Sequence, residues 1–157
     1  MMTEKKKEEI KTTTPEETYS LGWSLAKEIK KSNSQNERAL VIGLMGELGS
    51  GKTTFVQGLA RGLGIEEKVT SPSFVLIKRY SFKYPDQNKA QLYHIDCYRF
   101  TEPKELADLG FADFINQSAG VVLVEWASRV KDILPEDSWQ IHFEYVDFSQ
   151  RKIIIEK

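Results

Sequence analysis

The chain has 157 residues, a formal net charge of −1 and one cysteine. This length fits one domain that buries about two thirds of its unfolded surface. The near-neutral charge argues against a surface that would bind nucleic acid by charge alone. Because the only cysteine is Cys97, an internal disulfide is excluded and a reducing cytoplasm is favoured. No apolar stretch approaches the roughly 20 residues of a membrane span, so we expect a cytoplasmic protein without a membrane segment.

The N-terminal segment has mixed charges, and we expect residues 1–13 to form a flexible tail before a single domain over residues 14–157. Thr14, which a proline follows, predicts the N-cap of a helix. Glu17 is the residue that would complete a capping box with it. The apolar residues that follow have helical spacing and predict a helix that continues toward Lys31.

A phosphate-binding loop comes next, because residues 46–53 read Gly-Glu-Leu-Gly-Ser-Gly-Lys-Thr and match G-x-x-x-x-G-K-[ST] at every fixed position. The apolar run 39–44 predicts a strand before the loop, and the helical spacing within 53–63 predicts a helix after it. The glycines allow successive N–H groups to surround a polyphosphate, and the helix N-terminus adds positive charge. The sequence therefore predicts a nucleoside triphosphate site.

Two residues of the loop have distinct expected roles. Lys52 is placed to reach the β- and γ-phosphates, and the Thr53 hydroxyl is placed to coordinate Mg²⁺. The residues that we expect to contact the nucleotide from this segment are Glu47, Leu48, Gly49, Ser50, Gly51, Lys52, Thr53 and Thr54.

The middle of the chain predicts an antiparallel pair of strands. Residues 74–82 and 90–95 are rich in strand-forming residues, and a turn over 84–88 separates them. Thr101 then predicts the N-cap of a short helix that Gly110 ends.

The last third of the chain predicts three more strands. The continuous apolar run 120–124 is typical of a parallel strand buried on both faces. Residues 139–145 alternate between apolar and polar and turn into a strand over 152–156. The expected fold is an α/β, P-loop NTPase-like three-layer sandwich, whose central and mainly parallel sheet has antiparallel edge strands.

Two strands end in acids, Asp96 and Glu125. Ligands of open α/β sheets gather at the carboxyl ends of the strands, so both carboxylates are expected near the phosphates. One would hold Mg²⁺ with Thr53, and the other would orient or activate the attacking water. The alternative for either acid is to cap a neighbouring helix. Spacing alone does not decide which acid takes the metal.

Three further polar side chains have two possible roles each. His94 shares a strand face with Asp96, so the two could exchange protons, or His94 could be a hydrogen-bonded, half-buried histidine. Ser71 and Ser73 bracket a proline, so they either sense the γ-phosphate or provide turn chemistry.

Trp126 and two arginines complete the set of candidates. Trp126 follows Glu125 and either covers the nucleotide or a partner or belongs to the core. Arg129 or Arg99 either supplies positive charge to the γ-phosphate or forms a surface ion pair.

Four motifs together resemble the TsaE family, bacterial ATPases in biosynthesis of the tRNA modification threonylcarbamoyladenosine. They are the phosphate loop 46–54, Thr70-Ser-Pro-Ser-Phe74, His94-Ile-Asp-Cys-Tyr-Arg99 and Val124-Glu-Trp126. The likeness extends from about residue 14 to the end of the chain. The phosphate loop alone is generic, whereas the combination of the other three is specific. One position departs from the family pattern, because Ser73 stands where a threonine is usual.

The resemblance implies roles for individual residues. Lys52 would act on the phosphates of ATP, and Thr53 and Glu125 would hold Mg²⁺. Asp96 would be needed for hydrolysis, and Thr18 would approach the nucleotide from the N-terminal side. These are implications of the family likeness.

The resemblance also implies that the chain by itself has weak ATPase activity. It further implies a complex with the subunits TsaB and TsaD that modifies adenosine 37 of tRNAs, so that tRNA would be an indirect partner. A small-molecule kinase is the alternative, although only Arg129 and Lys131 follow Glu125 where a kinase needs an arginine-rich lid. A GTPase-like switch is less favoured, because residues 88–91 lack the aspartate of a guanine-specific element.

Overall fold

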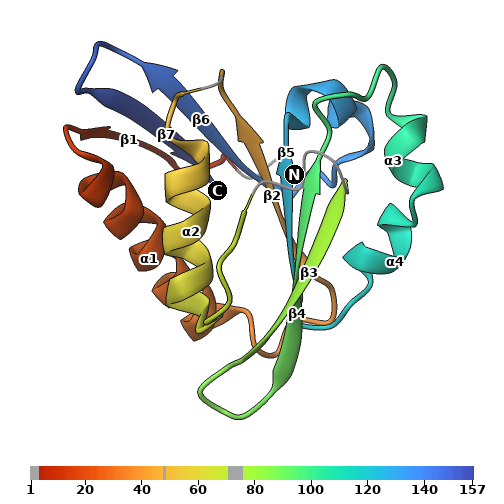
Figure 1. Ribbon diagram of the computed structural model, residues 1–157. Helices are drawn as coiled ribbons and strands as arrows, with labels where there is room; N and C mark the ends of the chain where they lie inside the picture. The colour runs from red at the N-terminus through yellow and green to blue at the C-terminus, as the bar shows by residue number, and fades with distance from the viewer. Residues whose placement is uncertain (1–3, 48, 71–75) are drawn as a thin grey trace.

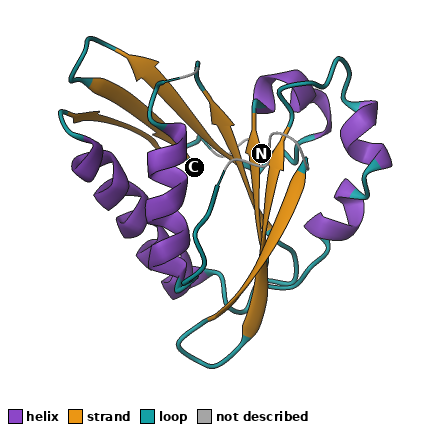
Figure 2. Ribbon diagram, viewed as in Figure 1, coloured by secondary structure: helices purple, strands orange, loops and turns teal. Residues whose placement is uncertain are grey.

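The computed structural model describes residues 4–47, 49–70 and 76–157, which form one seven-stranded sheet with helices on both faces (Figures 1 and 2). In the described residues, no helix is both long and apolar enough to cross a membrane. The elements in chain order are β1 (Lys7–Thr12), α1 (Pro15–Ser32), β2 (Leu40–Met45), α2 (Lys52–Leu63), β3 (Ile77–Lys83), β4 (Lys89–Asp96), α3 (Lys104–Asp108), α4 (Phe111–Ile115), β5 (Val121–Glu125), the 3-10 helix η1 (Ala127–Ile133), β6 (Trp139–Tyr145) and β7 (Arg151–Glu156).

The strand order is β1-β7-β6-β2-β5-β4-β3. The four central strands, β6, β2, β5 and β4, run parallel to one another. Antiparallel strands complete the sheet on both sides, with β7 and β1 beyond β6 and with β3 beyond β4. The predicted fold class is therefore confirmed, including its antiparallel edges.

The alternation of side chains along β5 explains the three layers. Val121 and Leu123 point into the core beneath α1 and α2, whereas Val122 and Val124 point into the second core, beneath α3, α4 and η1. All of these side chains are fully buried. A strand with helices on both faces must be apolar on both faces, which is why its sequence is a continuous apolar run.

The start of α1 is built largely as predicted. The Glu17 backbone N–H donates to Thr14 Oγ1 at 3.1 Å, so Thr14 is the N-cap. The Glu17 carboxylate, however, accepts from the Thr13 backbone N–H at 2.6 Å instead of from that of Thr14. The reciprocal bond is thus shifted by one residue, and the helix start is tied to the end of β1.

The structure differs from the expected tail over residues 1–13, because Lys7–Thr12 forms the edge strand β1. It pairs antiparallel with β7 in continuous register, from Lys7 opposite Glu156 to Thr12 opposite Arg151. This pairing satisfies backbone groups of β7 that would otherwise form an open edge. The strand is mostly exposed and so lacks the apolar alternation that identifies buried strands.

One further expectation is confirmed over the described residues, and another needs correction. Among the described residues β3 begins at Ile77, whereas the expected strand began within the segment 71–75, which lies outside them. Thr101 is not an N-cap, since α3 begins after Pro103; instead Thr101 donates from its backbone N–H to the Glu105 carboxylate at 3.0 Å. Gly110, with φ of 96°, ends α3 as expected but also leads directly into α4, which the sequence did not reveal.

Candidate functional site

A cavity of about 720 Å³ opens where β4 and β5 end and α2 begins. It lies at the carboxyl ends of parallel strands, the usual ligand position in an open α/β sheet. Its lining comes from three parts of the chain. They are the phosphate loop and α2 (Glu47, Gly49, Gly51, Lys52, Thr53, Thr54), the strand ends (Asp96, Tyr98, Arg99, Glu125, Trp126), and the start of α1 with the β6–β7 hairpin (Thr13, Thr14, Pro15, Glu16, Thr18, Phe148, Ser149, Arg151).

The phosphate loop has the backbone that its glycines predicted. Gly46, Gly49 and Gly51 have φ values of 148°, 78° and 100°, a region that side-chain-bearing residues rarely adopt. Gly51 is the N-cap of α2, and no side chain caps that helix end. The first N–H groups of α2 therefore lack an intrahelical partner at the cavity wall, which is the arrangement that favours an anion.

One described member of the expected nucleotide-contact set, Ser50, does not line the cavity. Ser50 is buried, and its hydroxyl donates to the Glu47 carbonyl oxygen at 2.5 Å, so its side chain stabilises the loop conformation. Leu48 lies outside the described residues, as do Ser71 and Ser73, so their expected contacts stay predictions.

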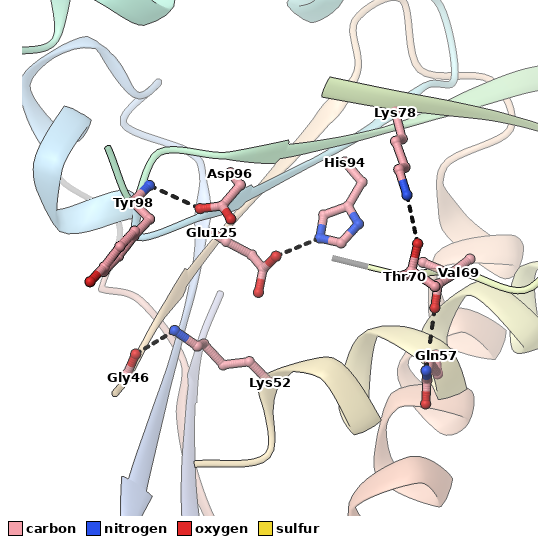
Figure 3. Close-up of polar contacts among 10 residues, drawn as sticks. All are labelled: Gly46, Lys52, Gln57, Val69, Thr70, Lys78, His94, Asp96, Tyr98 and Glu125. Carbon is pink, nitrogen blue, oxygen red and sulfur yellow. Dashed lines mark hydrogen bonds and ion pairs between the residues drawn. The ribbon is translucent and has the colours of Figure 1, made fainter. Parts of the chain in front are cut away.

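Lys52 is buried, and its side chain extends to Gly46 on the side of the cavity that faces Asp96 and Glu125 (Figure 3). Its ammonium group donates to the Gly46 carbonyl oxygen and lies 4.1 Å from the centre of the Trp126 ring. Burial lowers the pKa of Lys52 from its ordinary value, while the Glu125 and then the Asp96 carboxylates act in the opposite direction. The loop thus directs a cation into a cavity whose other wall carries two acids.

Asp96 and Glu125 are direct neighbours in the register of β4 and β5, and each is only 5% exposed. The backbone N–H of Tyr98 donates to Asp96 Oδ1 at 2.9 Å, which fixes that carboxylate by a local turn. Glu125 Oε2 lies 2.8 Å from His94 Nε2 (Figure 3). Among the helices that the structure describes, none has either acid as its N-cap, and both acids line the cavity.

Of the two alternatives for His94, the structure supports the hydrogen-bonded histidine, and its recorded partner is Glu125 and not Asp96. Residues two apart along a strand are about 6.6 Å apart, which is too far for a direct hydrogen bond between short side chains. A diagonal neighbour on the adjacent strand is within reach of a longer side chain. His94 is also 2% exposed and therefore more deeply buried than the half-buried position that we expected.

Tyr98 and Trp126 line the cavity, and Arg129 packs against both of their rings. The two rings are 5.0 Å apart between centroids, and the Arg129 guanidinium lies 5.4 Å from the Trp126 ring and 5.5 Å from the Tyr98 ring. Trp126 has a left-handed backbone, with φ of 58°, and is half-buried against the second core. It therefore contributes to the core and to the cavity wall at once.

Thr18 joins the start of α1 to the phosphate loop. Its hydroxyl lies 2.7 Å from that of Thr12 on β1, and both are buried. A Cβ atom placed on Gly51 would lie 3.4 Å from the Thr18 methyl group, so the loop passes directly over this residue. The edge strand β1, which was not predicted from the sequence, thus supports one wall of the cavity.

The wall formed by the β6–β7 hairpin was likewise not predicted from the sequence. Phe148 is 93% exposed at the hairpin tip, and Arg151 donates from Nε to the Gly49 carbonyl oxygen at 3.1 Å. The sequence feature that could have indicated this wall is a phenylalanine beside a turn. It indicates a cavity wall only once β6 is known to pair with β2, because that pairing places the hairpin beside the phosphate loop.

The comparisons with known proteins agree with this architecture. The family model "Threonylcarbamoyl adenosine biosynthesis protein TsaE" matches residues 12–153. The chain is 37% identical over 143 residues to the tRNA threonylcarbamoyladenosine biosynthesis protein TsaE of Bacillus subtilis, which covers 91% of this chain and 81% of that protein. It is 34% identical over 111 residues to the protein of the same name from Haemophilus influenzae, covering 71% of this chain and 66% of the relative, just under two thirds.

A solved structure supports the same assignment. The crystal structure of YdiB from Bacillus subtilis superposes with a TM-score of 0.72 at 32% identity, covering 99% of this chain and 88% of that one. The likeness in sequence and the likeness in fold therefore concern nearly the whole chain. On these matches, the chain belongs to the TsaE family of threonylcarbamoyladenosine biosynthesis proteins.

Proposed function

We propose that this chain binds ATP with Mg²⁺ and hydrolyses it, as the nucleotide-driven subunit of a complex with TsaB and TsaD that modifies adenosine 37 of tRNAs. The observation that carries the proposal is one shared cavity. In it, the phosphate loop and Lys52 lie opposite two buried acids, Asp96 and Glu125, at adjacent strand ends. Family membership supplies the pathway.

The residues present fit a magnesium ion held mainly by the nucleotide. The Thr53 side chain is exposed on the cavity wall, and the Glu125 carboxylate lines the same cavity. Mg²⁺ commonly takes one or two protein oxygens and completes its shell with phosphate and water. Among the described residues, no group of three or more His, Cys, Asp or Glu gathers as a metal cage, so this oxygen pair is the best candidate. When bound, the ion would neutralise charge on the phosphates.

The remaining polar groups suit the other parts of the reaction. Lys52 and the N-terminus of α2 would stabilise negative charge on the β- and γ-phosphates. Asp96, which the Tyr98 N–H holds in one orientation, would orient the attacking water. The wall formed by Thr18 and the β6–β7 hairpin would receive the adenosine, since the other lining residues belong to the phosphate loop and to the strand ends that carry the acids.

The partners and the location belong to the proposal as well. An ATPase that resets a partner complex has weak activity alone and gains activity when the partner completes or orders the site. We place the protein in the cytoplasm with its tRNA-modifying partners, where a buried free thiol such as Cys97 stays reduced.

One experiment separates this function from the small-molecule kinase. Purified chain is mixed with TsaB and TsaD, with and without Mg²⁺ and ATP, and both complex formation and phosphate release are measured. We expect nucleotide-dependent association and faster release of inorganic phosphate in the complex. Transfer of the γ-phosphate to a small-molecule acceptor, without any effect of TsaB and TsaD, would refute the proposal.

A further inference from the structure

A buried imidazole lies behind the acid that the proposed function assigns to the metal. His94 projects from β4 toward Glu125 on the neighbouring strand, and its Nε2 atom lies 2.8 Å from Glu125 Oε2 (Figure 3). The side chains are 3% and 7% exposed, so water does not screen this contact. Among the described residues, His94 Nδ1 is the one buried side-chain nitrogen or oxygen without a hydrogen-bond partner.

The two ring nitrogens define the direction of the bond. An ionised carboxylate only accepts, so His94 Nε2 donates to Glu125 Oε2. The contact therefore requires a hydrogen on Nε2, an assignment that follows from the bond to Glu125.

This bond engages one of the two carboxylate oxygens of Glu125. Among the described residues, no hydrogen bond to Oε1 is recorded, and the Glu125 side chain lines the cavity opposite Lys52 and Thr53. A glutamate has several rotatable bonds, and a fixed contact at Oε2 removes much of that freedom before any ligand arrives. Hydrogen bonds that orient a metal-binding side chain commonly change metal affinity by 10–100-fold, as an order of magnitude.

We propose that His94 is a positioning residue, whose Nε2–H holds Glu125 Oε2 so that Oε1 is presented to the Mg²⁺ of the bound nucleotide. The inference rests on the proposed function, because it concerns the same site. Asp96 receives its orienting bond from the backbone N–H of Tyr98, so a substitution of the Tyr98 side chain would leave the donor of that bond in place. Glu125, in contrast, receives its recorded orienting bond from a side chain, so substitution at His94 can remove it.

The test compares three replacements of His94. Gln carries an N–H group near the position of Nε2, Asn carries one near Nδ1, and Leu fills similar space without a donor. Binding of a fluorescent ATP analogue is followed by anisotropy while MgCl₂ is titrated, and again in excess EDTA. Each variant is studied below its own melting temperature.

We expect His94→Leu and His94→Asn to raise the Mg²⁺ concentration for half-maximal binding by about 10–100-fold. His94→Gln should recover most of the loss, and binding in EDTA should change less than about threefold in all variants. In a Glu125→Gln background, His94→Leu should have little further effect, because the two residues act through one contact.

Three results would overturn the inference. An unchanged Mg²⁺ requirement in His94→Leu would do so, as would equal losses in the Gln and Leu variants, or a full additional loss in the Glu125→Gln background. If the wild-type chain bound the ATP analogue without any effect of Mg²⁺, the proposed function would fail together with the inference. The wild-type titration therefore distinguishes the two failures.

Discussion

The ammonium group of Lys52 lies 4.1 Å from the centre of the Trp126 ring and donates to the Gly46 carbonyl oxygen. The cation that the phosphate loop supplies is thus partnered by the protein itself in this structure. A bound triphosphate must draw it from these partners, so we expect the environment of Trp126 to change on binding. Titration with Mg²⁺ and ATP should alter the tryptophan emission, and Trp126→Phe should abolish the change although Trp23 and Trp139 remain.

Lys52→Ala should weaken ATP binding strongly, because the phosphates lose their fixed cation. Charge-assisted hydrogen bonds contribute about 1.5–3 kcal/mol, so we expect an affinity loss of roughly 10–150-fold. Isothermal titration calorimetry measures it directly. Lys83→Ala, at an exposed position outside the cavity lining, is the matched control. Equal affinities of wild type and Lys52→Ala would contradict the site.

Glu125→Gln and Asp96→Ala should leave ATP binding measurable while turnover falls. Loss of a group that acts on the reacting water or on the metal typically reduces the rate by about 10²–10⁴-fold. Phosphate release with saturating ATP is the measurement, and Asp113→Asn, at an exposed position on α4, is the control. Full activity in both variants would remove the two acids from the mechanism.

Gly58→Ala should destabilise the fold without touching the cavity. A Cβ atom at Gly58 would lie 2.0 Å from the Tyr19 carbonyl oxygen, so α1 and α2 would have to move apart. Overpacking of this kind costs about 1–3 kcal/mol in the free energy of unfolding. Arg61→Ala on the exposed side of the same helix should change it by less than about 0.5 kcal/mol. Urea denaturation followed by circular dichroism would show the difference, and equal midpoints would refute the close packing.

The thiol of Cys97 should be inert in the folded protein. Burial first, and then the negative charges of Asp96, Glu105 and Glu125, raise its pKa to about 12. The reactive thiolate is therefore scarce at pH 8 in the folded protein. In the unfolded chain, a cysteine with a pKa of about 8.5 is partly ionised at the same pH. A thiol reagent at pH 8 should label Cys97 promptly in denaturant and hardly at all without it. Rapid labelling of the native chain would contradict this burial.

The sequence predicts the parts of the fold that depend on local pattern. The apolar run 120–124, the glycine-rich loop and the Thr14 cap each carry their own signal, and β5, the loop backbone and the start of α1 match them. The edge strand β1 was not predicted, because its side chains are largely exposed and show no apolar alternation. Its strand conformation depends on pairing with β7, which the sequence does not show.

The candidate site likewise has residues that a local sequence pattern predicts and contacts that it does not predict. Lys52, Asp96 and Glu125 were found from a motif and from strand ends, and the structure brings them to one cavity. The partner of His94 and the position of the β6–β7 hairpin depend on which strands lie side by side. Strand order in a parallel sheet is set by contacts between distant segments, and a single sequence does not reveal them.

The pairing of β2 with β5 has a consequence for how this protein reaches its native state. Leu40 lies opposite Val121, more than half the chain away, so the centre of the sheet cannot form until most of the polypeptide is available. Structures that are only partly assembled would then lack the arrangement that grips the triphosphate. Ligand should bind only the finished molecule, and millimolar ATP would raise the melting temperature by mass action.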